Sequence, residues 1–341
     1  MPHKVGHLFE KITTRENVVG AWEDYNRNRP IYRRRRREID DAEVDSILSE
    51  LSSWTFDFGK PREKDIWECG KIRHLKIPSF RSTIAQYAVF RVINPIIDAR
   101  LPEMSMSSRK GRGGHLLAKK VNRKITTDRK DTAFALYFDI RKFYDHIRID
   151  DAIFALSRIV KDEKVVSLVT QMFTPCGDGL PIGYVGAHML ANLVGAEIFR
   201  ILRQFKGVTY GCVYMDNFHF FARSRAPLHR LQKFAVKVLA EYGMEMKPDW
   251  QIFPVEDRGV RIAGIVVKPR GTNRLYDRTF RRMTASISRA FRRPNDKNLN
   301  SVMSYLGWLM ATRRMRLICD KIKEEKIKCR CTLIQKLVPT N

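Results

Sequence analysis

A hairpin with a carboxylate at its tip is the feature that most restricts what this sequence can fold into. Residues 214–217, Tyr-Met-Asp-Asn, separate two apolar runs at 211–213 and 218–222. This pattern predicts a strand, a tight turn and a returning strand, because Asp216 and Asn217 both tolerate the positive φ that tight turns require. The carboxylate of Asp216 would then lie where it can bind a metal ion.

A second carboxylate lies upstream, at Asp139. This residue ends an apolar run at 136–138 and precedes a basic, aromatic segment at 140–144. Either aspartate alone is usually only a turn residue. Two hard oxygen ligands from separate strands are what a magnesium-dependent phosphoryl transfer needs. The Gly-Pro loop at 179–183, between the two motifs, makes the combination more specific. The pair therefore predicts a metal-dependent enzyme that acts on phosphate groups.

The net charge is strongly positive. The 341 residues include 64 Lys and Arg against 37 Asp and Glu, which gives a formal charge of +27. Such an excess favours a polyanion, either a nucleic acid or a membrane surface. No apolar run approaches the roughly 20 residues of a spanning helix, and no signal peptide is recognisable, so we expect a cytoplasmic protein without a membrane partner.

The positive charge is unevenly distributed, and more than half of it lies after Arg258. Residues 278–293 and 300–328 are predicted to form helices whose basic faces contact a nucleic-acid backbone. A further basic run, Arg33 to Arg37, lies in a helical N-terminal part of the chain. It is either a solvated stretch or a contact with RNA phosphates.

Apolar periodicity predicts an α+β fold. Two strands are expected around Gly70 within 65–80, forming a basic hairpin that carries Lys71 and Arg73. Helices are expected at 84–101, 150–173, 197–205 and 228–242. Strands that alternate with helices around the two aspartates give an α+β domain with both carboxylates on its sheet.

Several motifs resemble, in order and spacing, those of the reverse transcriptases. Residues 138–144 resemble the first catalytic palm motif of bacterial and intron-type enzymes, and 214–217 stand where the family has Tyr-x-Asp-Asp. Residues 179–183 and 190–192 resemble the loop and helix behind the incoming nucleotide. The other matches are the fingers strands at 70–73 and 77–81, the Gly-rich basic stretch at 107–115, and the last palm motifs at 246–255 and 260–264.

The resemblance implies a right-hand polymerase fold with fingers, a palm and a helical thumb. The palm would be an antiparallel sheet with helices and would carry both carboxylates, while the thumb would grip a duplex backbone. The implied domains are a basic N-terminal helical extension at 1–60, fingers at 61–130, a palm at 131–270, and a basic helical thumb with a C-terminal tail at 271–341.

The resemblance also implies the roles of individual residues. Asp139, Asp216 and Asn217 would form the catalytic site and bind Mg²⁺. The carbonyl of Ile140 would complete the metal shell. Asparagine keeps one carbonyl ligand but loses a charge, so Mn²⁺ is the alternative cation. Deoxynucleoside triphosphates would be bound by Lys71, Arg73, Tyr144, Ile182 and Gly183, and phosphates of RNA or DNA by Arg109, Lys110, Arg112, Arg281, Arg282, Arg292 and Arg293.

Tyr144 lies five residues after Asp139, where the family carries the aromatic gate that rejects a ribose 2′-hydroxyl. A bulky ring there implies the use of deoxynucleotides, and the alternative is an ordinary core tyrosine. His188 belongs to the same region by its place in the motif. It is either a hydrogen-bond partner of a base or sugar, or a satisfied core histidine.

Within the family, the resemblance is greatest to the enzymes of diversity-generating retroelements. The features shared with them are the opening segment 8–13, Asn17, Ala21-Trp22 and Ile182. Two features depart from their pattern: Ala187-His188 stand where Ser-Gln is usual, and Asn217 replaces the second hairpin aspartate. These departures indicate a diverged relative, such as a defence-associated bacterial reverse transcriptase.

Three functions are therefore open. The first is a reverse transcriptase that copies a dedicated non-coding RNA in bacterial antiphage defence, and the second is the mutagenic enzyme of a diversity-generating retroelement. The third is a catalytically inactive RNA-binding scaffold, which Asn217 favours and the preserved Asp139 and Asp216 oppose. The expected partners are a structured non-coding RNA and an RNA/DNA duplex, with a partner protein or a homo-oligomer as a further expectation.

Overall fold

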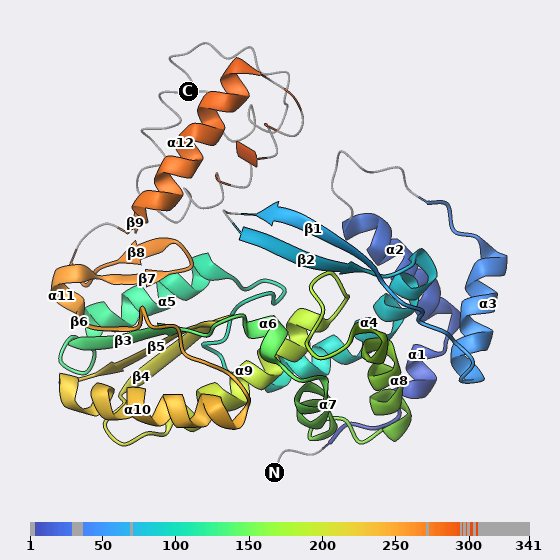
Figure 1. The fold of residues 1–341 in the computed structure, drawn as a ribbon, viewed down its shortest axis with the longest axis horizontal. Helices are drawn as coiled ribbons and strands as arrows, with labels where there is room; N and C mark the ends of the chain where they lie inside the picture. Colours follow the sequence, from blue (N-terminus) through green and yellow to red (C-terminus); the bar gives the residue numbers. More distant parts are fainter. Residues whose placement is uncertain are drawn as a thin grey trace.

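The computed structural model describes residues 4–28, 37–68, 71–270, 273–293, 295, 298, 301–302 and 305. Over these residues the chain forms helices and antiparallel sheets, in the α+β arrangement predicted from the sequence (Figure 1). The arginines at 33–36 and most of the helix predicted at 300–328 lie outside the described residues. Among the helices described, none is long and apolar enough to cross a membrane.

A four-stranded antiparallel sheet in the order β4-β5-β3-β6 carries both aspartates. Its strands are β3 (Phe134–Asp139), β4 (Tyr210–Tyr214), β5 (Asn217–Ala222) and β6 (Gln251–Pro254). A two-residue turn of Met215 and Asp216 joins β4 to β5, so the predicted hairpin is confirmed. In the register of β3 and β5, Asp139 lies directly opposite Asn217.

The two faces of this sheet are buried against different elements, because successive side chains of a strand point to opposite faces. Phe138 and Phe218 stack at 5.1 Å on one face, and Phe220 stacks on Phe199 of α9 (Ala187–Arg203). Helix α10 (Arg225–Glu241) covers the same face (Figure 1). The opposite face packs against α5 (Gly114–Thr127), and the side chains of Asp139 and Asn217 belong to it.

A second, three-stranded antiparallel sheet lies over α5. It consists of β7 (Val260–Ile262), β8 (Ile265–Val267) and β9 (Arg274–Leu275), and its apolar residues share one core cluster with those of α5. The short helix α11 (Val255–Arg258) connects β6 to this sheet, and α12 (Asp277–Arg292) follows it. Helix α12 therefore extends away from the central sheet beyond β9 (Figure 1).

The N-terminal helices pack on the long helix α4 (Phe80–Arg100) and share its core cluster. They are α1 (Phe9–Ile12), α2 (Arg15–Asn28) and α3 (Asp41–Ser52). The Asn17 amide donates 2.9 Å to the carbonyl of Ala88, which ties α2 to α4. The hairpin of β1 (Arg62–Glu68) and β2 (Lys71–Ile77) projects beside these helices, as predicted from the sequence (Figure 1).

The single helix predicted at 150–173 is wrong, because the chain forms two helices there. They are α7 (Ile149–Ser157) and α8 (Glu163–Phe173). The break between them pairs with the N-terminal segment, since the N–H of Val5 donates to the carbonyl of Ile159 and that of Lys161 donates to the carbonyl of Val5. The carboxylate of Asp162 then accepts the N–H groups of Leu8 and Phe9. These long-range bonds compensate the interrupted helix.

Candidate active site

The two predicted carboxylates are brought together by strand register. Asp139 ends β3, and Asp216 occupies the turn that leads into β5, one residue before the partner of Asp139. The N–H of Ile140 donates 3.0 Å to the carbonyl of Asp216, which attaches the turn to the end of β3. Met215 has a φ of 56°, the left-handed conformation that a tight turn needs. The residue with positive φ in this turn is therefore Met215, whereas the sequence pointed to Asp216 and Asn217.

The side-chain amide of Asn217 connects Asp216 to Tyr137 of the sheet, because both its nitrogen and its oxygen form hydrogen bonds. Its Nδ2 donates 2.7 Å to Oδ1 of Asp216, and its Oδ1 accepts 2.8 Å from the hydroxyl of Tyr137. Burial raises the pKa of Tyr137 to about 12, so this hydroxyl remains a donor at neutral pH. In this arrangement Asn217 orients the carboxylate of Asp216. An aspartate at position 217 would offer no N–H for that bond.

Lys247 is a site residue that sequence reasoning missed. Its ammonium forms an ion pair with Oδ1 of Asp139, and its backbone N–H donates 2.8 Å to the carbonyl of Asp139. Lys247 belongs to the segment 246–255 that carries a palm motif, so the available signal was a lysine inside a motif of the site. Its approach to Asp139 depends on the path of the chain between α10 and β6.

The environment of Asp139 favours a bound cation. Burial, followed by the charge of Asp216, raises the pKa of Asp139 to about 6, and Lys247 opposes this rise. Oδ1 of Asp139 is buried, and the Lys247 ammonium is its ion-pair partner. Among the described residues, no group of three or more Asp, Glu, His or Cys side chains is arranged so that it could hold a metal ion. The donor set that fits a divalent cation is thus two carboxylates, with the carbonyl of Ile140 adjacent in sequence.

A buried pair behind the turn was also missed. The Ser107 hydroxyl donates 2.8 Å to Oδ1 of Asn192, and the Asn192 amide donates 2.8 Å to the carbonyl of Ser107. The N–H of Met215 donates 3.2 Å to the Ser107 hydroxyl. Both polar residues are buried on segments that resemble family motifs. They connect the Gly-rich basic stretch and α9 to the catalytic turn and so limit its movement.

Ile182 and Gly183, two of the predicted nucleotide-binding residues, lie where the Gly-Pro loop contacts Lys76 of the β1–β2 hairpin. The N–H of Lys76 donates 2.9 Å to the carbonyl of Ile182, and the N–H of Leu180 donates 3.0 Å to the carbonyl of Tyr144. Gly183 has a φ of 118°, and a Cβ there would lie 2.5 Å from the Lys76 carbonyl. This close approach of two backbones requires glycine.

Tyr144 connects this junction to the carboxylates. It lies on the short helix α6 (Phe143–His146), beyond β3. Burial and the charge of Asp216 raise the pKa of Tyr144 to about 12, and Arg73 of β2 opposes the rise. The hairpin arginine and Asp216 thus both act electrostatically on one tyrosine ring. Lys71, two residues before Arg73, is exposed near the end of the hairpin.

Arg109 was predicted to contact nucleic acid, and the structure corrects this. Its side chain is only 2% exposed, and its five N–H donors are all used. Nε and one terminal nitrogen bind the carboxylate and carbonyl of Asp98, and the other terminal nitrogen donates to the carbonyls of Pro102 and Ser105. Arg109 therefore holds this loop together and has no donor left for a phosphate. Its neighbour Lys110 is exposed, as is Arg112.

Helix α12 carries the remaining predicted nucleic-acid contacts. Met283, Ser286 and Ala290 are buried on one side of it. Arg281, Arg292 and Arg293 are exposed, and Arg282 is half-buried. Helical spacing therefore separates an inner face from an outer basic face, as predicted.

Comparisons with known proteins agree with this architecture. Residues 60–262, more than half of the chain, match the family described as reverse transcriptase (RNA-dependent DNA polymerase). A relative from Arabidopsis thaliana, nuclear intron maturase 1, mitochondrial, is 28% identical over 106 residues. These residues are 29% of this chain and 14% of the relative, so the chain spans only a small part of that protein.

Two solved structures of telomerase from Candida tropicalis have a similar fold. The apo telomerase has a TM-score of 0.50 and 12% identity, covering 62% of this chain and 48% of that one. The telomerase in complex with the TWJ fragment of telomeric RNA has a TM-score of 0.50 and 13% identity, covering 66% and 47%. This chain therefore spans about half the length of the telomerase chains, with a shared right-hand polymerase fold. With more than half of its length matched, the chain belongs to the reverse transcriptase family.

Proposed function

We propose that this chain is an RNA-directed DNA polymerase that joins deoxynucleotides by metal-dependent nucleotidyl transfer. The observation that carries the proposal is the pair of carboxylates, Asp139 at the end of β3 and Asp216 in the turn before the adjacent strand β5. Backbone hydrogen bonds position both residues, and Oδ1 of Asp139 is buried with the Lys247 ammonium as its ion-pair partner. A site for a divalent cation is the simplest use of two such carboxylates at the end of a sheet.

The residues at this site have different tasks in the proposal. Asp139 and Asp216 hold Mg²⁺ or Mn²⁺, with the carbonyl of Ile140 as a further ligand. The bound cations supply the activation of the primer hydroxyl and the neutralisation of the leaving pyrophosphate. Asn217 orients Asp216 by its 2.7 Å hydrogen bond. Lys247 offsets the negative charge of Asp139 while the cation is absent.

The incoming nucleotide binds between the β1–β2 hairpin and the Gly-Pro loop. Lys71 and Arg73 hold its triphosphate, because a guanidinium fork matches phosphate oxygens. Ile182 and Gly183 shape the loop beneath the base pair. Tyr144 has its ring near Asp216, and this ring rejects a ribose 2′-hydroxyl. The polymerase therefore prefers deoxynucleoside triphosphates.

The nucleic-acid partner is bound along the basic surfaces. Lys110, Arg112 and the exposed arginines of α12 contact phosphates of an RNA template or of an RNA/DNA duplex. The net charge of +27 and the likeness to an intron maturase support a stably bound, structured RNA. A partner protein or a second copy of the chain belongs to the same proposal as a further component.

The biological role we propose is bacterial antiphage defence with a dedicated non-coding RNA. Its support is the departure of Ala187, His188 and Asn217 from the pattern of diversity-generating retroelements. A neighbouring gene for a non-coding RNA would favour defence, and a neighbouring pair of variable repeats would favour the diversifying enzyme. An inactive scaffold is the third candidate, and Asn217 is the observation that favours it.

A test of sugar selectivity separates the two polymerase candidates from the inactive scaffold. The purified protein is given a primed RNA template with either deoxynucleoside or ribonucleoside triphosphates. We expect extension with the deoxy form alone, and extension with both forms in Tyr144→Ala. Tyr144→Phe is the matched control, since it keeps the ring and should keep the selectivity. Extension with neither form would reject the polymerase and favour the scaffold.

A further inference from the structure

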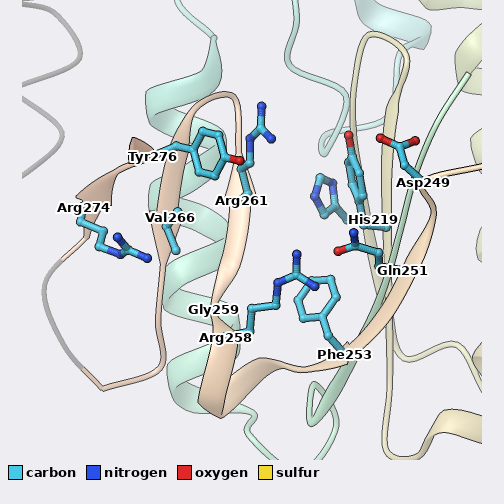
Figure 2. A pocket seen from close by; sticks show the side chains of 11 residues that line it. His219, Asp249, Gln251, Phe253, Arg258, Gly259, Arg261, Val266, Arg274 and Tyr276 are labelled. Carbon is cyan, nitrogen blue, oxygen red and sulfur yellow. The ribbon is translucent and has the colours of Figure 1, made fainter. Parts of the chain in front are cut away.

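A cavity of about 290 Å³ lies between the central sheet and the β7–β9 sheet (Figure 2). The central sheet contributes Tyr137, His219 and Gln251 to its lining. Small-molecule sites have volumes of about 300–1,000 Å³, so this cavity suits a ligand of modest size. Tyr137 also joins the cavity to the catalytic turn, because its hydroxyl donates to Asn217.

One wall of the cavity presents arginines. The guanidinium of Arg258 lies 4.9 Å from the centroid of Phe253, and that of Arg261 lies 3.9 Å from the centroid of Tyr276. Among the described residues, neither arginine forms an ion pair with a carboxylate. Each guanidinium thus lies over one aromatic ring, and its N–H groups can donate to a ligand. Arg274, the third arginine of the lining, forms an ion pair with the first residue of α12.

The opposite wall is polar and neutral apart from one carboxylate. His219 is 2% exposed, and its Nδ1 has no hydrogen-bond partner among the described residues. Burial lowers the pKa of His219 to about 4, so its ring is neutral at physiological pH. Gln251 and Asp249 line the same side, as Figure 2 shows. This wall can exchange hydrogen bonds with hydroxyl and amino groups.

We infer that this cavity binds a free mononucleotide. Arg258 and Arg261 bind the phosphate, since paired guanidinium forks recognise phosphate oxygens. Gln251 and Asp249 bind the hydroxyl groups of the sugar or the polar edge of the base. A bare phosphate would leave the polar wall without a partner, and an uncharged nucleoside would leave the arginines without one. The ligand must therefore carry both parts.

The site is distinct from the position proposed for the incoming triphosphate. That position is formed by Arg73 on β2 and Tyr144 on α6, whereas the cavity is lined by the α5-facing side of the central sheet and by β7–β9. The two positions are linked through Tyr137, Asn217 and Asp216. A nucleotide that hydrogen-bonds Tyr137 thus acts on the orientation of a catalytic carboxylate.

Calorimetric titration of the full chain, freed of nucleic acid, tests this inference. The probe is adenosine 5′-monophosphate, which has no triphosphate and cannot be incorporated. Inorganic phosphate, adenosine and a short oligodeoxythymidylate are titrated separately. The variant Arg258→Gln removes one fork from an exposed residue, and Arg230→Gln on α10 is the matched control. Thermal melting of each variant checks that it is folded.

We expect saturable binding of the monophosphate and at least tenfold weaker binding in Arg258→Gln. Arg230→Gln should bind as the unmodified chain does, and phosphate and adenosine alone should each bind more weakly than the monophosphate. Equal affinity in Arg258→Gln, or no binding at millimolar monophosphate, would overturn the inference. Binding of the oligonucleotide without binding of the monophosphate would overturn it too, since the ligand would then be a strand.

Discussion

Restoring a carboxylate at position 217 should weaken the fold when no metal is present. In Asn217→Asp, the 2.7 Å bond from the amide to Asp216 is replaced by a contact between two carboxylates. A hydrogen bond to a charged group contributes about 1.5–3 kcal/mol, and this is lost. Repulsion between the two half-buried carboxylates destabilises the fold further, until one of them takes up a proton. Protonation therefore limits the total loss of stability to about 2–4 kcal/mol.

Thermal melting with a chelator and with Mg²⁺ measures this effect. Each kcal/mol lowers the melting temperature of a domain of a few hundred residues by about 2–4 °C, so we expect a fall of about 4–16 °C in chelator. Mg²⁺ should reverse much of it, because the introduced carboxylate adds a negative ligand to the pair. Asn217→Ala removes the bond without adding a charge, so it should be less destabilised and gain no more from Mg²⁺ than the unmodified chain does. A variant Asn217→Asp as stable in chelator as the unmodified chain would refute this reasoning.

Three further predictions concern Lys247, His219 and Arg109. Lys247→Met removes the ammonium that lowers the pKa of Asp139, so the acidic limb of nucleotide incorporation should move to higher pH; an unshifted limb would contradict the ion pair. The pKa of His219 is about 4 when folded, against an ordinary 6.5, so the unfolded chain binds the proton more readily. Stability should fall by about 3 kcal/mol as the pH drops from 6.5 to 4, and denaturant titrations of His219→Gln should lack this component. Arg109→Gln should cost about 1.5–3 kcal/mol in denaturant titrations, because it removes hydrogen bonds to a half-exposed carboxylate and to loop carbonyls. It should leave the salt dependence of RNA binding unchanged, whereas Lys110→Gln should lower its slope by about one.

That Asp139 and Asp216 lie close together could be predicted from the sequence, because their placement depends on local rules. A two-residue turn with alternating apolar flanks determines a hairpin register. That register places Asn217 at the start of β5, next to Asp216. Once β3 pairs with β5, Asp139 lies opposite Asn217. The hairpin of Lys71 and Arg73 follows from the same rules.

Residues whose environment depends on distant parts of the chain could not be predicted. Arg109 lies in a basic, glycine-rich stretch whose composition predicts that it is exposed. Only the fold brings Asp98 and two loop carbonyls around its side chain. Lys247 reaches Asp139 by the path of the chain after α10. The break at 158–162 has no strong helix breaker, and it exists because the N-terminal segment pairs with it. Long-range contacts override local propensity in each case.

Incorporation of labelled deoxynucleotides tests the central claim most directly. The unmodified chain, Asp139→Ala and the control Asp150→Asn, an exposed residue of α7, are compared on a primed RNA template with Mg²⁺ or Mn²⁺. We predict template-dependent extension by the unmodified chain and by Asp150→Asn, with none by Asp139→Ala and none in chelator. Extension that survives in Asp139→Ala, or its absence from the unmodified chain with both metals, would contradict a polymerase built on Asp139 and Asp216.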